Sequence, residues 1–351
     1  MHWPKTATIM TVALSCLIVI GCKDTDRGEG SDSVTELTFG VISTESAKGL
    51  KKGFKPLLAD MSKALGVPVT GRYVTEYSSV ITGMTYKQVD IAWLGNKSAV
   101  EALDRAGGEV FARTVAADGS PGYWAVIIVH TDSPYHSIDE IIADGGKLMF
   151  GNGDPNSTSG YLIPSYYLWG ERGIRPVKHF KRVVNANHEA NALAIAAGRI
   201  DFATNNTENL VLLRAKRPAI AAKIRVIWKS PLIPNDPLVW RKDLPDETKR
   251  AIRKFFLSYG RGDGPEAERQ RKILADISGG WAPFKASNDD HLLPIREMMV
   301  AREVMEIEQN ESLSDGDKQA KLAPLKQRLA ELHERRQALK ESAAENAGQE
   351  D

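Results

Sequence analysis

Residues 148–169, LMFGNGDPNSTSGYLIPSYYLW, decide the fold because they lead from a buried strand through a glycine-rich loop into a helix. Leu148, Met149 and Phe150 form an apolar run of strand length, and a helix is predicted from about Ser159 to Trp169. Glycines permit the unusual backbone angles of a tight loop. A strand, a loop and a helix in succession are the repeating unit of α/β proteins, so this stretch predicts an α/β fold.

The hydroxyls of Ser157, Thr158 and Ser159 lie where this helix begins, and they allow two interpretations. The first N–H groups of a helix lack partners and lie at its positive end, so the helix start can hold a tetrahedral oxyanion without a cationic side chain. The other interpretation is a well-capped turn, because Asp-Pro and Asn-Ser are common turn formers. The loop matches neither the dinucleotide-binding fingerprint nor the P-loop pattern.

Apolar runs alternate with helical patterns on both sides of this stretch. Before it, strands are expected at 37–42, 67–74, 89–93 and 123–130, with helices at 50–65 and 78–86. In a second set, strands are expected at 148–150, 183–184, 201–203 and 224–228, with further helices at 137–143, 189–197 and 208–213. A strand at 238–240 and a helix at 246–259 follow. The alternation predicts largely parallel sheets.

The two sets of elements have similar size and predict two lobes. We place lobe 1 at residues 35–128 and 238–295 and lobe 2 at residues 129–237, with crossing strands at 124–130 and 237–240. Residues 296–351 form a C-terminal helical extension, with helices at 295–311 and 317–344 separated by Gly316. Leucines recur there at heptad spacing, at positions 322, 325, 329, 332 and 339. This amphipathic extension either packs on its own domain or forms a homodimer seam.

Composition excludes several classes of protein. The chain has 351 residues, of which 42% are hydrophobic and 26% charged, as expected for one or two ordinary globular domains rather than a multispan membrane protein or a disordered chain. A formal net charge of +1 provides no field for nucleic acid. Two cysteines, Cys16 and Cys22, are too few for a disulfide scaffold or a cysteine zinc site. We expect no cofactor and no metal.

The N-terminus has the pattern of an export signal. An apolar run from Ile9 to Ile20 is too short to span a bilayer but suits a signal peptide at residues 1–21. The sequence VIGC at 19–22 resembles the bacterial lipobox, so we expect lipidation at Cys22, although a plain signal peptide is the alternative. Lys23 mildly favours the outer membrane, and the polar residues 22–34 are expected to be a flexible tether.

Four longer motifs occur in the folded part of the chain. They are GNGDPNSTSG (151–160), VAADGSPGYW (115–124), ATNNTEN (203–209) and IWKSPLIP (227–234). Together they closely resemble the phosphonate-binding periplasmic proteins of phosphonate ABC transporters, from about Leu37 to the C-terminal helices. The resemblance implies the type II periplasmic binding protein fold, a Venus flytrap whose two lobes of mixed sheet and flanking helices close around a ligand.

The same resemblance implies an alkylphosphonate ligand, with 2-aminoethylphosphonate expected, and delivery to an inner-membrane permease with its ATPase subunit. Its phosphonate oxygens would be held by Ser157, Thr158, Ser159 and His188, while Tyr77 and Tyr123 close from the other lobe. Its ammonium would be received by Glu208 and Asp236. A zwitterion needs donors at one end and carboxylates at the other, which agrees with these residue types.

Each of these residues also has an ordinary structural interpretation. Glu208 and Asp236 suit a helix start and a turn, His188 suits a cap or core position, and the two tyrosines suit a core. Two positions depart from the family pattern: Leu94 stands where a tyrosine is expected and could alter preference among alkyl substituents, and Asn187 replaces a glycine. A binder of methylphosphonate or phosphite is one alternative function, and a hydrolase using Ser157 or Ser159 with His188 and Asp154 or Asp236 is another.

Overall fold

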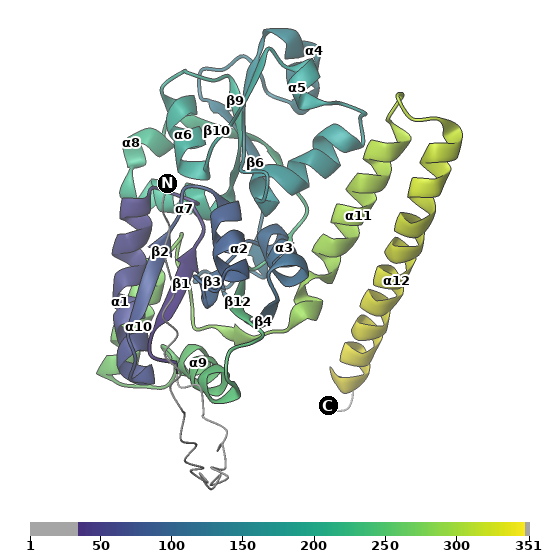
Figure 1. Cartoon of the computed structure of the whole chain (residues 1–351). Coiled ribbons are helices and arrows are strands. Elements are labelled where there is room, and N and C mark those ends of the chain that lie inside the picture. The colour runs from purple at the N-terminus through teal and green to yellow at the C-terminus, as the bar shows by residue number, and fades with distance from the viewer. Residues whose placement is uncertain (1–33, 348–351) are drawn as a thin grey trace, which may run out of the picture. The chain divides into compact units, whose positions relative to one another are not determined.

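Two β-sheets organise residues 34–347, the part of the chain that the computed structural model describes (Figure 1). The six-stranded sheet of lobe 1 has the order β13-β4-β12-β3-β1-β2, and the five-stranded sheet of lobe 2 has the order β10-β6-β9-β7-β8. The strands of lobe 1 are β1 (Leu37–Val41), β2 (Val69–Tyr73), β3 (Ile91–Trp93), β4 (Gly108–Arg113), β12 (Pro237–Arg241) and β13 (Lys285–Ala286). Those of lobe 2 are β6 (Ala125–His130), β7 (Met149–Asn152), β8 (Arg182–Asn185), β9 (Phe202–Asn206) and β10 (Ile224–Lys229).

Helices pack around both sheets. In lobe 1 they are α1 (Ala47–Leu65), α2 (Tyr77–Thr85), α3 (Asn96–Arg105), α9 (Asp246–Ser258) and α10 (Pro265–Ala275). In lobe 2 they are α4 (Ile138–Ala143), α5 (Pro176–His179), α6 (His188–Ala196), α7 (Thr207–Lys216) and α8 (Pro218–Ala221). Short helical turns are η1 (Gly145–Lys147) and η4 (Asp289–Leu292), and η2 (Thr158–Leu162) and η3 (Ser165–Gly170) are π-helical.

Local sequence explains where α1 begins and ends. The Ser46 hydroxyl accepts the Gly49 N–H at 3.4 Å, and Gly66 ends the helix in the left-handed conformation at φ 71°. Leu50, Phe54 and other apolar residues of one face are buried against the sheet, where Phe54 lies 5.7 Å from Trp93 between ring centroids. The amphipathic pattern of α1 therefore places its polar face toward solvent, as predicted with Gly66 as the stop.

The sheets are mixed, as the resemblance implied, and the expectation of largely parallel sheets from alternation alone was wrong. β1 pairs in parallel with β2 and β3, and β7 with β8 and β9. However, β12 pairs antiparallel with β3 and β4, and β6 antiparallel with β9 and β10. β6 and β12 each follow a crossing between lobes, so they enter their sheets from the other end and run against their neighbours.

The two crossings between the lobes run side by side. The strand β5 (Gly122–Tyr123) of the first crossing pairs antiparallel with β11 (Ile233–Pro234) of the second. All residues of β6 from Ala125 to Val129 pair with β9 of lobe 2, so the boundary placed between residues 128 and 129 falls inside a lobe 2 strand. The boundary at 237–238 falls at the start of β12 in lobe 1.

The predicted helix at 159–169 is present but differs in form. Residues 158–170 are helical throughout, with π-helical turns in η2 and η3 on either side of Ile163 and Pro164. Proline has no N–H to donate, so a proline in a helix interior disrupts the regular α-helical ladder. The sequence predicted the helix but not the wider turns.

The C-terminal extension is a hairpin of α11 (Leu293–Glu308) and α12 (Asp315–Ala347), which lies along the side of both lobes (Figure 1). Arg296 forms a 2.7 Å ion pair with Asp104 of α3 in lobe 1, and Gln309 donates to the Gly170 carbonyl of lobe 2 at 2.8 Å. Gly316 does not separate the helices: it lies in the first turn of α12, because Ser314 accepts the Asp317 N–H and starts the helix earlier.

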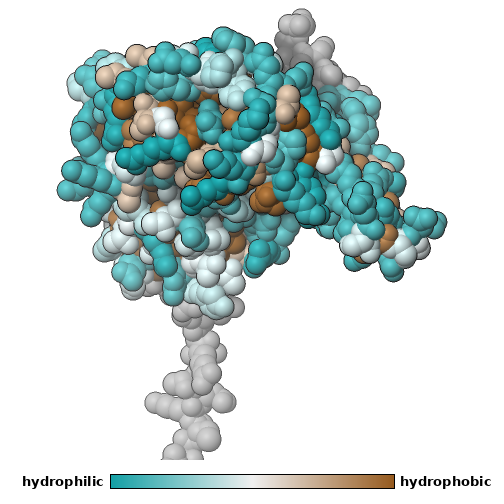
Figure 2. Space-filling view, turned by 90° about the horizontal axis from the view of Figure 1, so that it is seen from above, coloured by the Kyte–Doolittle hydropathy of each residue, from teal (hydrophilic) through white to brown (hydrophobic). Residues whose placement is uncertain are grey.

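Four of the heptad leucines of α12 are half-buried, and Leu339 is 41% exposed. Polar residues dominate the face of the molecule shown in Figure 2, where hydrophobic residues lie in small separate groups. No helix within residues 34–347 is long and apolar enough to cross a membrane. The predicted signal peptide, most of the tether and Cys22 lie outside the described residues.

Candidate functional site

The loop after β7 folds back on the helix that it starts. The Gly153 N–H donates to the Gly160 carbonyl at 3.0 Å, and a Cβ on Gly153 would lie 2.5 Å from the Gly160 carbonyl carbon, so only glycine fits. The Ser157 hydroxyl accepts the Gly160 N–H at 3.0 Å. The capped turn of the structural interpretation is thus present. It also fixes the neighbouring hydroxyls at the helix start.

Those hydroxyls lie where the two lobes meet. Thr158 Oγ1 accepts the Lys97 N–H at 2.9 Å, from the first turn of α3 in lobe 1. Ser159 Oγ lies 3.2 Å from His188 Nε2, and Asn206 Nδ2 donates to the same oxygen at 3.4 Å. The helix starts of α3 and η2 therefore approach each other across the lobe interface, where both present N–H groups and positive dipole ends.

His188 is the first residue of α6 and is 3% exposed. Burial lowers its pKa to about 4, so the imidazole is neutral at pH 7. Its Nδ1 has no hydrogen-bond partner among the described residues, so no carboxylate orients or charges the ring from behind. The ring is thus held through Nε2 and Ser159 alone.

Acidic and phenolic groups form the other end of the site. The Tyr123 hydroxyl donates to Asp236 Oδ1 at 2.8 Å, and Asn96 Nδ2 donates to the same oxygen at 3.4 Å. Burial raises the pKa of Asp236 to about 7. Glu208 lies in the first turn of α7, and burial of its carboxyl, reinforced by the charge of Asp236, raises its pKa well above the ordinary value.

Tyr77 interacts with both the hydroxyl end and the acidic end of the site. Its N–H donates to Asp154 Oδ2 of the loop at 3.0 Å, and its side chain is 4% exposed. Burial, followed by the charges of Asp154 and Asp236, raises the pKa of Tyr77 well above its usual range, so the phenol stays protonated. The Tyr123 phenol is kept neutral in the same way, by burial and by Asp236.

The structure thus brings all eight predicted ligand residues to one interface between the lobes. Hydroxyls and His188 gather at one end of it, and Glu208 and Asp236 at the other, each end beside a buried tyrosine. Among the described residues there is no group of three or more His, Cys, Asp or Glu side chains that could hold a metal ion.

Sequence reasoning missed several residues of this interface: Asn96, Lys97, Asp154 and Asn206. They contact Asp236, Thr158, Tyr77 and Ser159 respectively. Apart from Asn96, which is near Asp236 only through the fold, each sits at a helix cap or loop position that an ordinary turn would also explain. Asp154 and Asn206 lie within the motifs quoted above, where Asp154 was considered only for the hydrolase alternative, and Asn96 and Lys97 lie outside those motifs.

The two departures from the family pattern have different surroundings. Leu94 is fully buried in the hydrophobic core of lobe 1. Asn187 caps α6 by accepting the Ala190 N–H at 2.8 Å, and its Nδ2 donates across the lobe interface to Ser43 Oγ at 3.2 Å. The asparagine therefore adds a contact between the lobes that glycine could not make.

Comparisons with known proteins identify relatives of this chain. The family described as "ABC transporter, phosphonate, periplasmic substrate-binding protein" matches residues 39–292. The phosphonates-binding periplasmic protein of Escherichia coli (strain K12) is 49% identical over 86% of this chain and 87% of its own length. A "probable ABC transporter phosphite binding protein" of Prochlorococcus marinus (strain MIT 9301) is 28% identical over 56% of this chain and 66% of its own.

Among solved structures, the binding protein component of an ABC phosphonate transporter from Pseudomonas aeruginosa superposes with a TM-score of 0.83. It is 48% identical, and the match covers 87% of this chain and 99% of that one. The two-lobed α/β arrangement described above is thus the fold of type II periplasmic binding proteins.

Proposed function

The chain belongs to the family of periplasmic substrate-binding proteins of phosphonate ABC transporters, and we propose that it captures alkylphosphonates, with 2-aminoethylphosphonate preferred. The observation that carries the preference is the pair of carboxylates of Asp236, which is buried, and Glu208, which is half-buried. Burial is the main influence on both groups, and none of the charges that act most on Glu208 is a cation. An ammonium placed between them would supply the missing positive charge.

The phosphonate end of the ligand would lie at the start of η2. Ser157, Thr158 and Ser159 can each donate a hydroxyl proton to an oxyanion, in addition to the N–H groups of the helix start. Neutral His188 and the neutral phenol of Tyr77 add donors without adding charge, and Tyr123 would add another by exchanging its hydrogen bond to Asp236 for one to the phosphonate. Recognition of the anion would rest on oriented dipoles and hydroxyls, as helix N-termini allow.

We propose binding rather than hydrolysis for the Ser159–His188 pair. The 3.2 Å contact has the spacing of a nucleophile and its base. Yet a triad needs a third group that orients the imidazole, and His188 Nδ1 has no such partner among the described residues. A histidine whose pKa lies near 4 is also a weak base at neutral pH.

Ligand binding would be coupled to lobe closure. The lobes are joined by hydrogen bonds from Lys97 to Thr158, from Tyr77 to Asp154 and from Ser46 to Glu189. We propose that the paired strands β5 and β11, together with the residues flanking them, act as the hinge, and that ligand stabilises the closed form. The closed protein would then deliver the phosphonate to an inner-membrane permease with its ATPase subunit.

The proposal includes two further expectations, a lipid anchor and a homodimer, and one alternative function stands beside it. The protein would be exported, then held by a lipid on Cys22, with the outer membrane mildly favoured. The α11–α12 hairpin would support a homodimer, for which the exposed edge at Leu339 leaves apolar surface available. The alternative function is a binder of a smaller oxyanion, which the phosphite-binding relative from Prochlorococcus favours.

Calorimetry of the wild type against four ligands separates these functions. We expect 2-aminoethylphosphonate to bind at least about tenfold more tightly than methylphosphonate, phosphite and phosphate, because charge-assisted hydrogen bonds to its ammonium add more than 1.4 kcal/mol. Equal or tighter binding of phosphite or methylphosphonate would favour the alternative. Loss of the phosphonate on incubation, followed by phosphorus NMR, would show an enzyme instead.

A further inference from the structure

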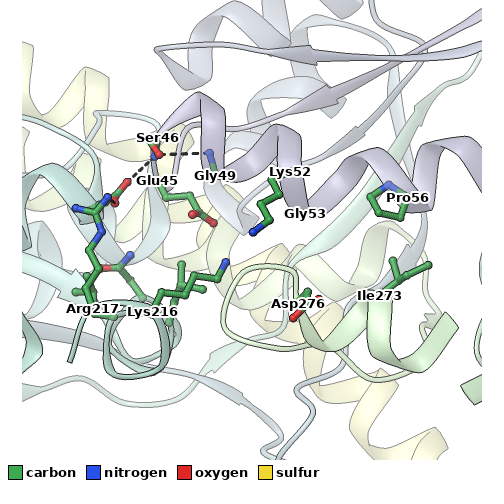
Figure 3. A pocket seen from close by; sticks show the side chains of 14 residues that line it. Glu45, Ser46, Gly49, Lys52, Gly53, Pro56, Lys216, Arg217, Ile273 and Asp276 are labelled. Atoms are coloured by element: carbon green, nitrogen blue, oxygen red, sulfur yellow. Dashed lines mark hydrogen bonds and ion pairs between the residues drawn. The ribbon is translucent and has the colours of Figure 1, made fainter. Parts of the chain in front are cut away.

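A groove separate from the phosphonate site runs between the two lobes. One wall is the N-terminal half of α1 with the end of α10, and the other wall is α7 (Figure 3). The groove holds about 890 Å³ of empty space, and Pro56, Leu212 and Ile273 provide apolar parts of its lining. Because α1 and α10 belong to lobe 1 and α7 to lobe 2, the groove is complete only when the lobes are closed.

A contact between the lobes fixes one edge of this groove. The Ser46 N–H at the start of α1 donates to Glu189 Oε2 at 2.7 Å, and Arg217 forms an ion pair with the same carboxylate at 3.1 Å. Glu189 is thus engaged on both sides and leaves little negative charge for other partners. The hydrogen bond between Ser46 and Glu189 would break if the lobes opened, because the two residues belong to different lobes.

The exposed charge around the groove is mainly positive. Lys48, Lys52 and Lys55 are exposed along α1 at i, i+4 and i+7, which places them on one stripe beside the groove. Lys216 faces them from α7, and in Figure 3 the ammonium ends of Lys52 and Lys216 point into the same space. Within the part of the chain that the structure describes, none of these four lysines has an ion-pair partner.

The acidic residues of the groove do not cancel this charge at its surface. Glu45 is only 6% exposed; burial raises its pKa, and the charge of Lys216 acts in the opposite direction, so Glu45 offsets part of the charge of Lys216 but none of that of the α1 stripe. Glu189 is engaged as described, which leaves Asp276 as the exposed acid of the lining. In a chain with a formal net charge of +1, four unpaired lysines around one groove are a local concentration of charge.

From these observations we infer that the groove is the docking surface for an acidic segment of the transporter's membrane subunit. The inference rests on the proposed function, which supplies the partner. Lysines on both walls and an apolar floor fit an extended acidic peptide, whereas a flat lipid surface cannot enter a groove. Since the two walls come from different lobes, the membrane subunit would recognise the closed protein in preference to the open one.

The test reverses the charge of the α1 stripe in the full-length protein. The variant carries Lys48→Glu, Lys52→Glu and Lys55→Glu at three exposed positions of α1, of which Lys48 lies in the first turn, where an acidic residue suits the helix dipole. The matched control carries Arg250→Glu, Arg253→Glu and Lys254→Glu on α9, three exposed cations of the same lobe that lack ion pairs among the described residues. The readout is stimulation of the reconstituted transporter's ATPase by each protein at saturating 2-aminoethylphosphonate.

We expect the stripe variant to need at least about tenfold more protein for half-maximal stimulation, and the control to stay within about twofold of wild type. Added salt should weaken the wild type but not the stripe variant. Calorimetry should give unchanged phosphonate affinity for both variants. A wild type that binds no phosphonate would refute the proposed function, and this result does not depend on the ATPase assay.

Three outcomes would overturn the docking surface itself. One is stimulation by the stripe variant at wild-type concentrations. Another is a loss that the α9 control shares or that weaker phosphonate binding explains. The last is salt-sensitive binding of the wild type, but not of the stripe variant, to transporter-free vesicles of phosphatidylethanolamine and phosphatidylglycerol, which would assign the lysines to a membrane surface.

Discussion

Replacing the two carboxylates is the most direct perturbation of the proposed selectivity. Asp236→Asn and Glu208→Gln keep the size of each side chain and remove its charge. The Tyr123 hydroxyl lies 2.8 Å from Asp236 Oδ1 and can still donate to the amide oxygen of asparagine, so the surrounding geometry should survive. Any change in ligand affinity would then report on charge rather than on packing.

The magnitude follows from the environment of the pair. A hydrogen bond to a charged group contributes about 1.5–3 kcal/mol and a neutral one about 1 kcal/mol, so each single substitution should cost 2-aminoethylphosphonate about tenfold in affinity. The double substitution would leave a buried ammonium without a counter-charge, which costs about 3–5 kcal/mol, or roughly 150- to 5,000-fold. Methylphosphonate, which has no ammonium, should change by less than about threefold in all three variants.

Titration calorimetry of the wild type and the three variants against both ligands measures these effects. Asp263→Asn, which alters an exposed carboxylate between α9 and α10, is a control for a change in overall charge. Unchanged affinity of the double variant for 2-aminoethylphosphonate would refute the ammonium clamp. Equal losses for both ligands would show that the carboxylates support the fold of the site rather than the ammonium.

Three other predictions follow from the contacts described above. The ratio of wild-type to Asp236→Asn affinity for 2-aminoethylphosphonate should rise from about pH 5 through pH 7 and level off above about pH 8, because ligand requires the ionised form of a carboxyl whose pKa burial has raised to about 7; a flat ratio by calorimetry would contradict this. Gly153→Ala should lower the free energy of unfolding by about 1–3 kcal/mol in urea, because its Cβ would meet the Gly160 backbone at 2.5 Å, whereas Gly146→Ala, with no atom within 4 Å, should have little effect. Removing residues 315–351 should convert a homodimer to a monomer in sedimentation equilibrium and leave phosphonate affinity intact, and a full-length protein that is already monomeric would exclude the dimer.

Elements of the fold could be predicted where the type of a single residue determines the local backbone structure. Gly66 ends α1 because a left-handed residue is needed there, and the apolar face of α1 fixes its orientation. The direction of β6 and β12 could not be predicted, because it depends on the crossing between lobes and not on their own residues. The prediction that Gly316 separates the two helices was wrong because the Ser314 hydroxyl accepts the Asp317 N–H and starts α12 before the glycine.

The residues of the site fall into the same two groups: some are marked by local sequence, and others are brought to the site only by the fold. Ser157, Thr158 and Ser159 stand out because they are adjacent hydroxyls at a helix start, a pattern that the chain itself displays. Lys97 contributes a backbone N–H, which every residue other than proline has, so no sequence pattern could mark it. Asp154 likewise matters only because folding brings its carboxylate to the Tyr77 N–H, 77 positions away along the chain.

The two ends of the site differ in how fully the protein satisfies their polar groups, and under the proposed function this difference would let a nearly neutral chain select a zwitterion. At the hydroxyl end, Thr158 accepts from Lys97 and keeps its own hydroxyl proton for an anion, so an anion exchanges an existing contact only at Ser159, which is paired with His188. At the acidic end, Asp236 receives neutral donors only, and a neutral donor stabilises a buried carboxylate less than a cation does. The larger gain is therefore available where an ammonium binds. An oxyanion without that ammonium would leave both carboxylates uncompensated, the buried Asp236 and the half-buried Glu208.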